Sequence, residues 1–126
     1  MNNNQFKDTE LLLRAVLPSE IYWENGSLSS AAFKDRKGLS VDRVNDRNLE
    51  IAVEKIKTTL RGSIVSVFVR DCHDVSACVK YLPSQNNPYH CEIHHSEKVK
   101  LLDEIQAKHL ASVAQIQYDC MAIPTI

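Results

Sequence analysis

Hydrophobic side chains recur with two different periods along this chain, and the two periods predict a mixture of α-helix and β-strand. The clearest helical stretch covers about residues 47–61, where apolar side chains follow one another every three or four positions and form a single stripe. Asn45 or Asp46 is the expected cap at the start of this helix, and Gly62 stands where a glycine commonly ends one.

A second helix is expected at about residues 97–115, with Ser96 as its cap. Its apolar face would consist of Leu102, Ile105, His109, Leu110 and Val113. A buried histidine on such a stripe is usually hydrogen-bonded within the core. His109 is therefore expected to be structural rather than catalytic.

Alternation with a period of two, and short runs rich in β-branched residues, predict β-strands elsewhere. The expected strands are 20–24, 27–33, 39–44, 63–69, 77–82 and 89–94. Asn25-Gly26 predicts a tight type I′ turn between the first two. Residues 10–17 fit either a helix or a strand, and a strand is favoured because Pro18 ends the run early. Residues 70–74 are expected to form a turn and residues 83–88 a loop.

The order of these elements predicts an α+β domain, with a mainly antiparallel sheet of about five to six strands and two helices packed on one face. The whole chain of 126 residues is expected to be one domain, long enough to bury about two thirds of its unfolded surface. Within it, residues 1–8 are expected to form a flexible arm, and residues 116–126 a docked tail or an edge strand.

Composition and charge narrow the functional classes. The formal net charge of -1 supplies no general attraction for nucleic acid or anionic lipid. No apolar run reaches about 18 residues, so no membrane span is predicted. The polar N-terminus lacks the apolar segment of a signal peptide, which makes the cytoplasm the expected location. The four cysteines would remain thiols there.

The main candidate for a catalytic site lies in the region that holds most of the histidines. On an extended strand, His90, Glu92 and His94 point to one side of the sheet. A histidine beside a carboxylate is the usual pair for general acid and base catalysis, so His90 and Glu92 are predicted to be catalytic. An ordinary solvated strand face would show the same pattern, and that alternative stays open.

The same residues are less suited to a metal ion. Three alternate residues of one strand span ~13 Å end to end, which is too far for all of them to bind one ion. The spacing of Cys72 and Cys78 does not match the paired cysteines of structural zinc sites. Neither a metal nor a cofactor is therefore expected, although His90 and Glu92, or Glu92 and His94, could bind an ion together with a ligand from elsewhere in the chain.

A second group of residues suits an anionic ligand. Ser30 and Ser40 lie in segments of small hydroxyl residues, and Arg14 and Arg43 lie on predicted strands. Serine hydroxyls and guanidinium groups together favour the binding of a phosphate, so all four are predicted ligand-binding residues. An ordinary polar turn with charged residues beside it would show the same pattern, and that alternative stays open. The chain has three glycines and no glycine-rich phosphate loop, which argues against Rossmann and P-loop sites.

Three segments resemble small bacterial proteins of uncharacterised function: residues 29–33, 39–42 and 87–93. This resemblance implies no activity, but it draws attention to Ser30, Ser40 and His90. The chain is also similar in one respect to ADP-ribosyltransferases and RES-type toxins, where an arginine on the first strand and a serine in a second motif contact NAD. Arg14 and Ser40 match that order, whereas no further motif matches and the chain is short for that fold.

Two functional hypotheses follow. In the first, this is a small cytoplasmic bacterial protein that binds or processes a phosphate-containing ligand, such as a nucleotide or an RNA end. His90 would be the general acid or base, Glu92 its orienting partner, and Arg14 or Arg43 the anion clamp. In the second, it is a non-enzymatic interaction module of a multi-component bacterial system.

In the module hypothesis the contacts to a protein partner come from the polar loop 83–88 and from the apolar C-terminal tail, residues 116–126. A toxin-like enzyme that uses NAD is a further alternative, and it rests on the arginine and serine resemblance alone. None of these hypotheses involves a membrane.

Overall fold

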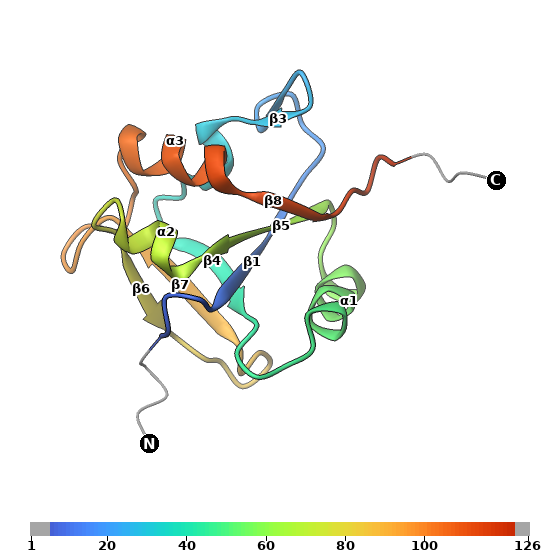
Figure 1. The fold of residues 1–126 in the computed structure, drawn as a ribbon, viewed down its shortest axis with the longest axis horizontal. Coiled ribbons are helices and arrows are strands. Elements are labelled where there is room, and N and C mark those ends of the chain that lie inside the picture. Colours follow the sequence, from blue (N-terminus) through green and yellow to red (C-terminus); the bar gives the residue numbers. More distant parts are fainter. Residues whose placement is uncertain (1–5, 123–126) are drawn as a thin grey trace.

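The computed structural model describes residues 6–122, and its main feature is a six-stranded sheet (Figure 1). The strands are β1 (Leu11–Val16), β2 (Trp23–Glu24), β3 (Ser27–Leu28), β4 (Leu39–Arg43), β5 (Ser63–Phe68), β6 (Cys78–Tyr81), β7 (His90–His94) and β8 (Gln115–Tyr118). The helices are the 3-10 helix η1 (Ser30–Phe33), α1 (Leu49–Thr59), α2 (Val69–His73) and α3 (Glu104–Val113). No helix in residues 6–122 is both long and apolar enough to cross a membrane.

The large sheet has the strand order β6-β7-β4-β1-β5-β8, and all neighbouring strands are antiparallel. The predicted α+β class and antiparallel sheet are therefore confirmed. Residues 11–16 form a strand, as the early proline suggested. Asn25 and Gly26 have φ angles of 53° and 82°, which are the positive values a type I′ turn requires, and they join β2 to β3.

The first predicted helix is present, but it is shorter than expected and has a different cap. Asn48 caps α1, because its Oδ1 accepts hydrogen bonds from the backbone N–H groups of Glu50 at 2.8 Å and Ile51 at 3.3 Å. Asn45 instead has a φ of 57°, so the chain turns there before the helix begins. Gly62 lies beyond the end, where an added Cβ would be 2.4 Å from the Val16 carbonyl oxygen.

The second helix begins later in the sequence than predicted. α3 begins after Asp103, which caps it together with Gln106 in a reciprocal capping box. Ser96 was the wrong cap: its Oγ accepts from the backbone N–H of Val99 at 3.2 Å in a turn before the helix. Ile105, predicted on the apolar face, is 76% exposed.

Two short helices replace elements that were predicted otherwise. Residues 30–33, expected to continue a strand, form η1, and residues 69–73, largely expected as a turn, form α2. η1 packs against α3, which explains why this segment leaves the hairpin so early. Both segments are too short to show a helical period, so the hydrophobic pattern of the sequence does not predict them.

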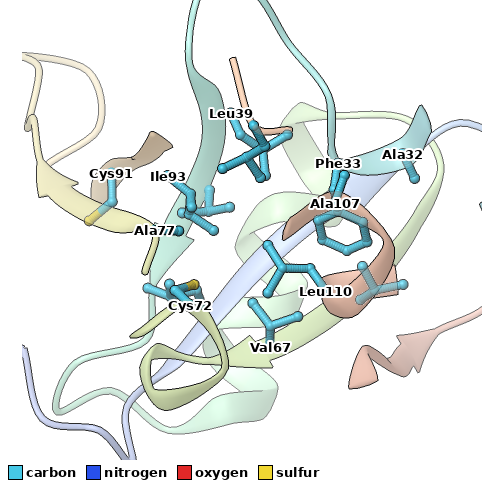
Figure 2. Close-up of a cluster of buried hydrophobic side chains, with 14 of the residues drawn as sticks. Ala32, Phe33, Leu39, Val67, Cys72, Ala77, Cys91, Ile93, Ala107 and Leu110 are labelled. Carbon is cyan, nitrogen blue, oxygen red and sulfur yellow. The ribbon is translucent and has the colours of Figure 1, made fainter. Parts of the chain in front are cut away.

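The main core lies on the first face of the sheet, beneath α3, α2 and η1. Figure 2 shows Phe33 of η1 against Ala107 and Leu110 of α3, with Val67 of β5 below them. Leu12 of β1 belongs to this cluster. Successive strand residues point to opposite faces, so the residue of β1 that follows Leu12 must point away from the main core.

A smaller core lies on the second face, where α1 covers the sheet. Leu13 of β1 and Ile64 of β5 pack there against Ala52, Val53 and Ile56 of α1. The prediction that both helices pack on one face is therefore wrong, because α1 and α3 lie on opposite sides. The buried residues of this second core include none from β6 or β7, which present polar side chains on that face.

The N-terminal end of the described chain is packed against the domain, and the C-terminal end follows an edge strand. Phe6, in the predicted N-terminal arm, contacts the main core, and Asp8 binds His73 at 3.0 Å. At the other end, β8 forms an edge of the sheet beside β5. Residues 1–5 and 123–126 lie outside the described residues.

Candidate functional site

The candidate site is the polar part of the second sheet face, formed by β4, β7 and β6. Antiparallel pairing places Ser40 opposite Glu92, Asp42 opposite His90, and Lys80 opposite Glu92. Directly paired residues of neighbouring strands point to the same side of a sheet. These five side chains, from three strands, therefore share one face.

Glu92 bridges two histidines of its own strand. Its Oε1 is 2.8 Å from Nε2 of His94, and its Oε2 is 3.4 Å from Nε2 of His90. The spacing of two residues on a strand brings all three to one side, and the central carboxylate is then within reach of both rings. The arrangement is one acceptor between two imidazoles.

The two histidines differ in their access to solvent. The side chain of His90 is 26% exposed, whereas that of His94 is 10% exposed. A ligand on the sheet face can therefore reach His90 more readily. His94 is suited to holding Glu92 in position rather than to contacting a ligand.

The pKa of Glu92 is lowered from its ordinary value by its surroundings. Burial alone would raise this pKa, but the hydrogen bonds to His94 and His90 lower it by more. The carboxylate is therefore ionised near neutral pH and remains a hydrogen-bond acceptor for both rings.

Gly38 brings the backbone of a turn directly onto this cluster. Its φ is 102°, and an added Cβ would be 2.2 Å from Oε1 of Glu92 and 3.0 Å from Nε2 of His94. Only a residue without a side chain fits both constraints. Arg36 and Lys37, which directly precede Gly38 in the sequence, are exposed, so this turn carries two positive charges at the surface.

The start of β7 is positioned by Asn87, a residue of the predicted loop 83–88. Its Nδ2 donates to Oδ1 of Asp42 at 2.9 Å, and its Oδ1 accepts from the backbone N–H of Tyr89 at 3.0 Å. These bonds connect the loop to β4 immediately beside His90. Asp42 could have been found from its alternation with Ser40, whereas its pairing with Asn87 has no local signal.

Arg14 lies on the other face of the sheet, away from His90. Its Nε donates to the Ala32 carbonyl at 2.7 Å and its Nη1 to the Ser40 carbonyl at 2.9 Å. Burial is the main cause that lowers the pKa of Arg14. The guanidinium meets the backbone of Ser40, while the Ser40 side chain points to the face that carries Glu92.

Arg43 is also on the first face, and it is 4% exposed. Its guanidinium forms two parallel bonds to the Glu10 carboxylate, at 2.8 and 2.9 Å, and packs between the rings of Phe6 and Tyr81. The hydrogen bond to Glu10 is the main cause that raises the pKa of Arg43. This is a buried structural ion pair.

Ser30 starts η1 beside α3, on the first face as well. Hydrogen bonds from Lys34 and then from Ser30 lower the pKa of Glu104 in α3. The structure thus brings together His90, Glu92 and Ser40, and it separates them from the side chains of Arg14, Ser30 and Arg43. Comparison of the chain with protein-family models, curated proteins and solved structures finds no match.

Proposed function

We propose that the polar sheet face binds a phosphate-containing ligand, a nucleotide or an RNA end, and that His90 transfers a proton there. The observation that supports this proposal is the carboxylate of Glu92 between His90 and His94, on a face where the His90 side chain is partly exposed. A histidine oriented by a carboxylate is a common arrangement for general acid and base catalysis.

The geometry assigns different tasks to the two ring nitrogens of His90. If Nε2 carries the proton and donates to Glu92, Nδ1 has a free lone pair and accepts a proton from a ligand hydroxyl. The resulting imidazolium is stabilised by the Glu92 carboxylate and can return the proton to a leaving oxygen. His94 is a positioning residue, because it holds the second oxygen of Glu92.

The anion clamp of this proposal differs from the one that the sequence suggested. Arg36 and Lys37 are exposed beside Gly38, and Lys80 lies across from Glu92 while it pairs with Glu97. These cations take the place of Arg14 and Arg43, whose guanidinium groups are bound on the other face. The exposed Ser40 hydroxyl adds a donor opposite Glu92.

The first experiment is a titration of the full chain followed by NMR of the histidine side chains. The probes are adenosine monophosphate, a short 5′-phosphorylated RNA, and the same RNA without its phosphate. We expect the His90 resonances to shift with the two phosphorylated probes and to change little with the third. A uniform absence of shifts, or equal shifts with all three, would contradict the proposal.

A matched pair of variants tests the role of His90. His90→Gln should weaken the interaction and abolish any turnover of the RNA end, whereas His73→Gln should do neither. His73 is a fair control because solvent reaches it and because it also pairs with a carboxylate, that of Asp8 at 3.0 Å. Equal effects of the two substitutions would show that His90 has no special role.

A separate observation favours the interaction module as a second candidate. A cavity of about 290 Å³ lies between the β2–β3 hairpin and the C-terminal segment, lined by residues that include Trp23, Ile116 and Met121. Ile116 and Met121 are 48% and 68% exposed, and β8 is an edge strand that can accept a further strand. The predicted tail contact would use this surface.

Two substitutions separate this candidate from the first. Ile116→Lys with Met121→Lys places charge on the apolar surface and should abolish capture of a protein partner, while His90→Gln should leave that capture intact. The measurement is cross-linking in cells, followed by quantification of each protein captured by the wild type, by the double lysine variant and by His90→Gln. Identical capture by all three would contradict the module.

A further inference from the structure

A second cluster of polar side chains lies between α2 and α3, on the opposite side of the sheet from His90. Asp71 of α2, Asp74 at its end and His109 of α3 each place one potential ligand atom within 4.8 Å of the other two. The spacing of three residues brings both aspartates to one side of the short helix. α2 lies directly beside α3 (Figure 1), which is why these residues of different elements come close together.

His109 carries the observation that points to a ligand. Its Nε2 atom is buried and has no hydrogen-bond partner among the described residues. The sequence predicted a hydrogen-bonded core histidine here, so the structure differs from that expectation. A buried ring nitrogen without a partner is unfavourable, and a bound ion would remove the deficit.

The two aspartate carboxylates, for their part, lack a positive charge between them. Two negative charges close together repel each other, and a cation between them stabilises both. Asp71 is already oriented, because its Oδ2 accepts from the backbone N–H of Phe68 at 2.8 Å. A carboxylate has two oxygens, so this bond can persist while the other oxygen binds an ion.

We propose that Asp71, Asp74 and His109 form a binding site for a divalent transition-metal ion of the manganese or zinc class. One imidazole and two carboxylates suit these ions, whereas calcium and magnesium prefer oxygen ligands alone. Asp74 is exposed, so water can complete the coordination. The ion connects α2 to α3, and the site is independent of the function proposed for the His90 face.

The test uses Mn²⁺, because carboxylate and imidazole bind it while the four free thiols of this chain compete for it poorly. The full chain is stripped with a chelator and titrated while electron paramagnetic resonance reports free Mn²⁺. We expect saturable binding of one ion per chain. Asp74→Asn should weaken it at least about 10-fold, since even changes outside the coordination shell commonly do so.

His73→Gln is the matched control, since His73 lies between the two aspartates on the same helix and is exposed. It should leave the affinity unchanged, as should His90→Gln on the other face. His109→Gln should weaken binding as Asp74→Asn does. Asp74→Asn keeps the test decisive if His109→Gln fails to fold, because the Asp74 side chain is at the surface.

Thermal unfolding supplies the second measurement. An ion that binds only the folded chain raises its melting temperature, so Mn²⁺ should raise that of the wild type and of His73→Gln but not that of Asp74→Asn. Absence of saturable binding to the wild type would overturn the proposal. Equal affinity, or an equal rise in melting temperature, in the wild type and Asp74→Asn would overturn it as well.

Discussion

At the scale of single residues, position 38 requires a glycine for two independent reasons. Its φ of 102° is unfavourable for residues with a side chain, and the space where a Cβ would lie is occupied by the Glu92 carboxylate. The same carboxylate bonds to both histidines of β7. The conformation of the turn at Gly38 therefore helps to fix the geometry of the candidate site.

Gly38→Ala should therefore both destabilise the chain and separate Glu92 from His94. Gly26→Ala is the control, because Gly26 also has a positive φ, 82°, but has nothing within 4 Å of the added Cβ. The control should cost roughly 1 kcal/mol of unfolding free energy from backbone strain. Gly38→Ala should cost at least about 1 kcal/mol more, because a buried hydrogen bond is lost. Urea denaturation of the two variants measures the difference, and equal losses would contradict the steric argument.

The carboxylate of Glu92 also predicts a dependence of stability on pH. Its pKa is lowered in the folded chain: burial opposes this, but the hydrogen bonds to His94 and His90 outweigh burial. A lowered folded-state pKa means that the stabilisation is complete above the ordinary value of 4.5 and is lost as the pH falls through the folded-state value.

Glu92→Gln removes the titrating group and tests this assignment. The difference in unfolding free energy between the wild type and Glu92→Gln should be largest near neutral pH and should shrink on acidification below about pH 4.5. Urea denaturation of both chains across that range measures it. A difference that stays constant with pH would show that Glu92 does not contribute through its charge.

At the scale of elements, Arg14 connects three segments that are far apart in the sequence. From β1 it donates to the carbonyl of Ala32 in η1 and to that of Ser40 in β4. Arginine suits this task because its guanidinium offers donors in several directions. An arginine inside an apolar run is therefore explained by the structure it supports.

Arg14→Met should lower the unfolding free energy by roughly 2–4 kcal/mol, because it leaves two carbonyls without a charged donor. It should change phosphate binding at the His90 face little, since that face is on the other side of the sheet. Chemical denaturation and the nucleotide titration together check the two statements. Loss of binding with unchanged stability would instead favour the anion clamp that the sequence suggested.

Element boundaries depended on contacts that local patterns do not contain. The stripe of α1 was visible in the sequence, but its start was set by the turn at Asn45 and the cap at Asn48. α3 starts where Asp103 and Gln106 cap each other, not where the first capping residue, Ser96, occurs. Several residues were chemically able to cap, and packing of Gln106 in the core selected among the positions.

At the scale of the whole molecule, the two sheet faces hold different chemistry. The first face carries the main core, the Arg43–Glu10 ion pair and the junction of α2 with α3. The second face is covered by α1 near β1 and β5, and it presents the polar cluster of β4, β6 and β7. Substitutions in the two proposed sites should therefore act independently, because no side chain belongs to both.

The amino-acid sequence by itself determined the features that depend on residues close together along the chain. Strand alternation placed His90, Glu92 and His94 on one side, Asn25-Gly26 specified the turn, and periodicity indicated the class of the fold. These follow from local sterics and side-chain spacing, which act over a few residues.

Tertiary structure alone decided which strands pair, in which register, and which face each helix covers. It paired Ser40 with Glu92, turned the side chains of Arg14 and Arg43 to the opposite face, and brought Asp71 and Asp74 to His109. Each of these contacts joins residues distant in the sequence. Burial and hydrogen bonding across the fold select them, and no local pattern encodes that choice.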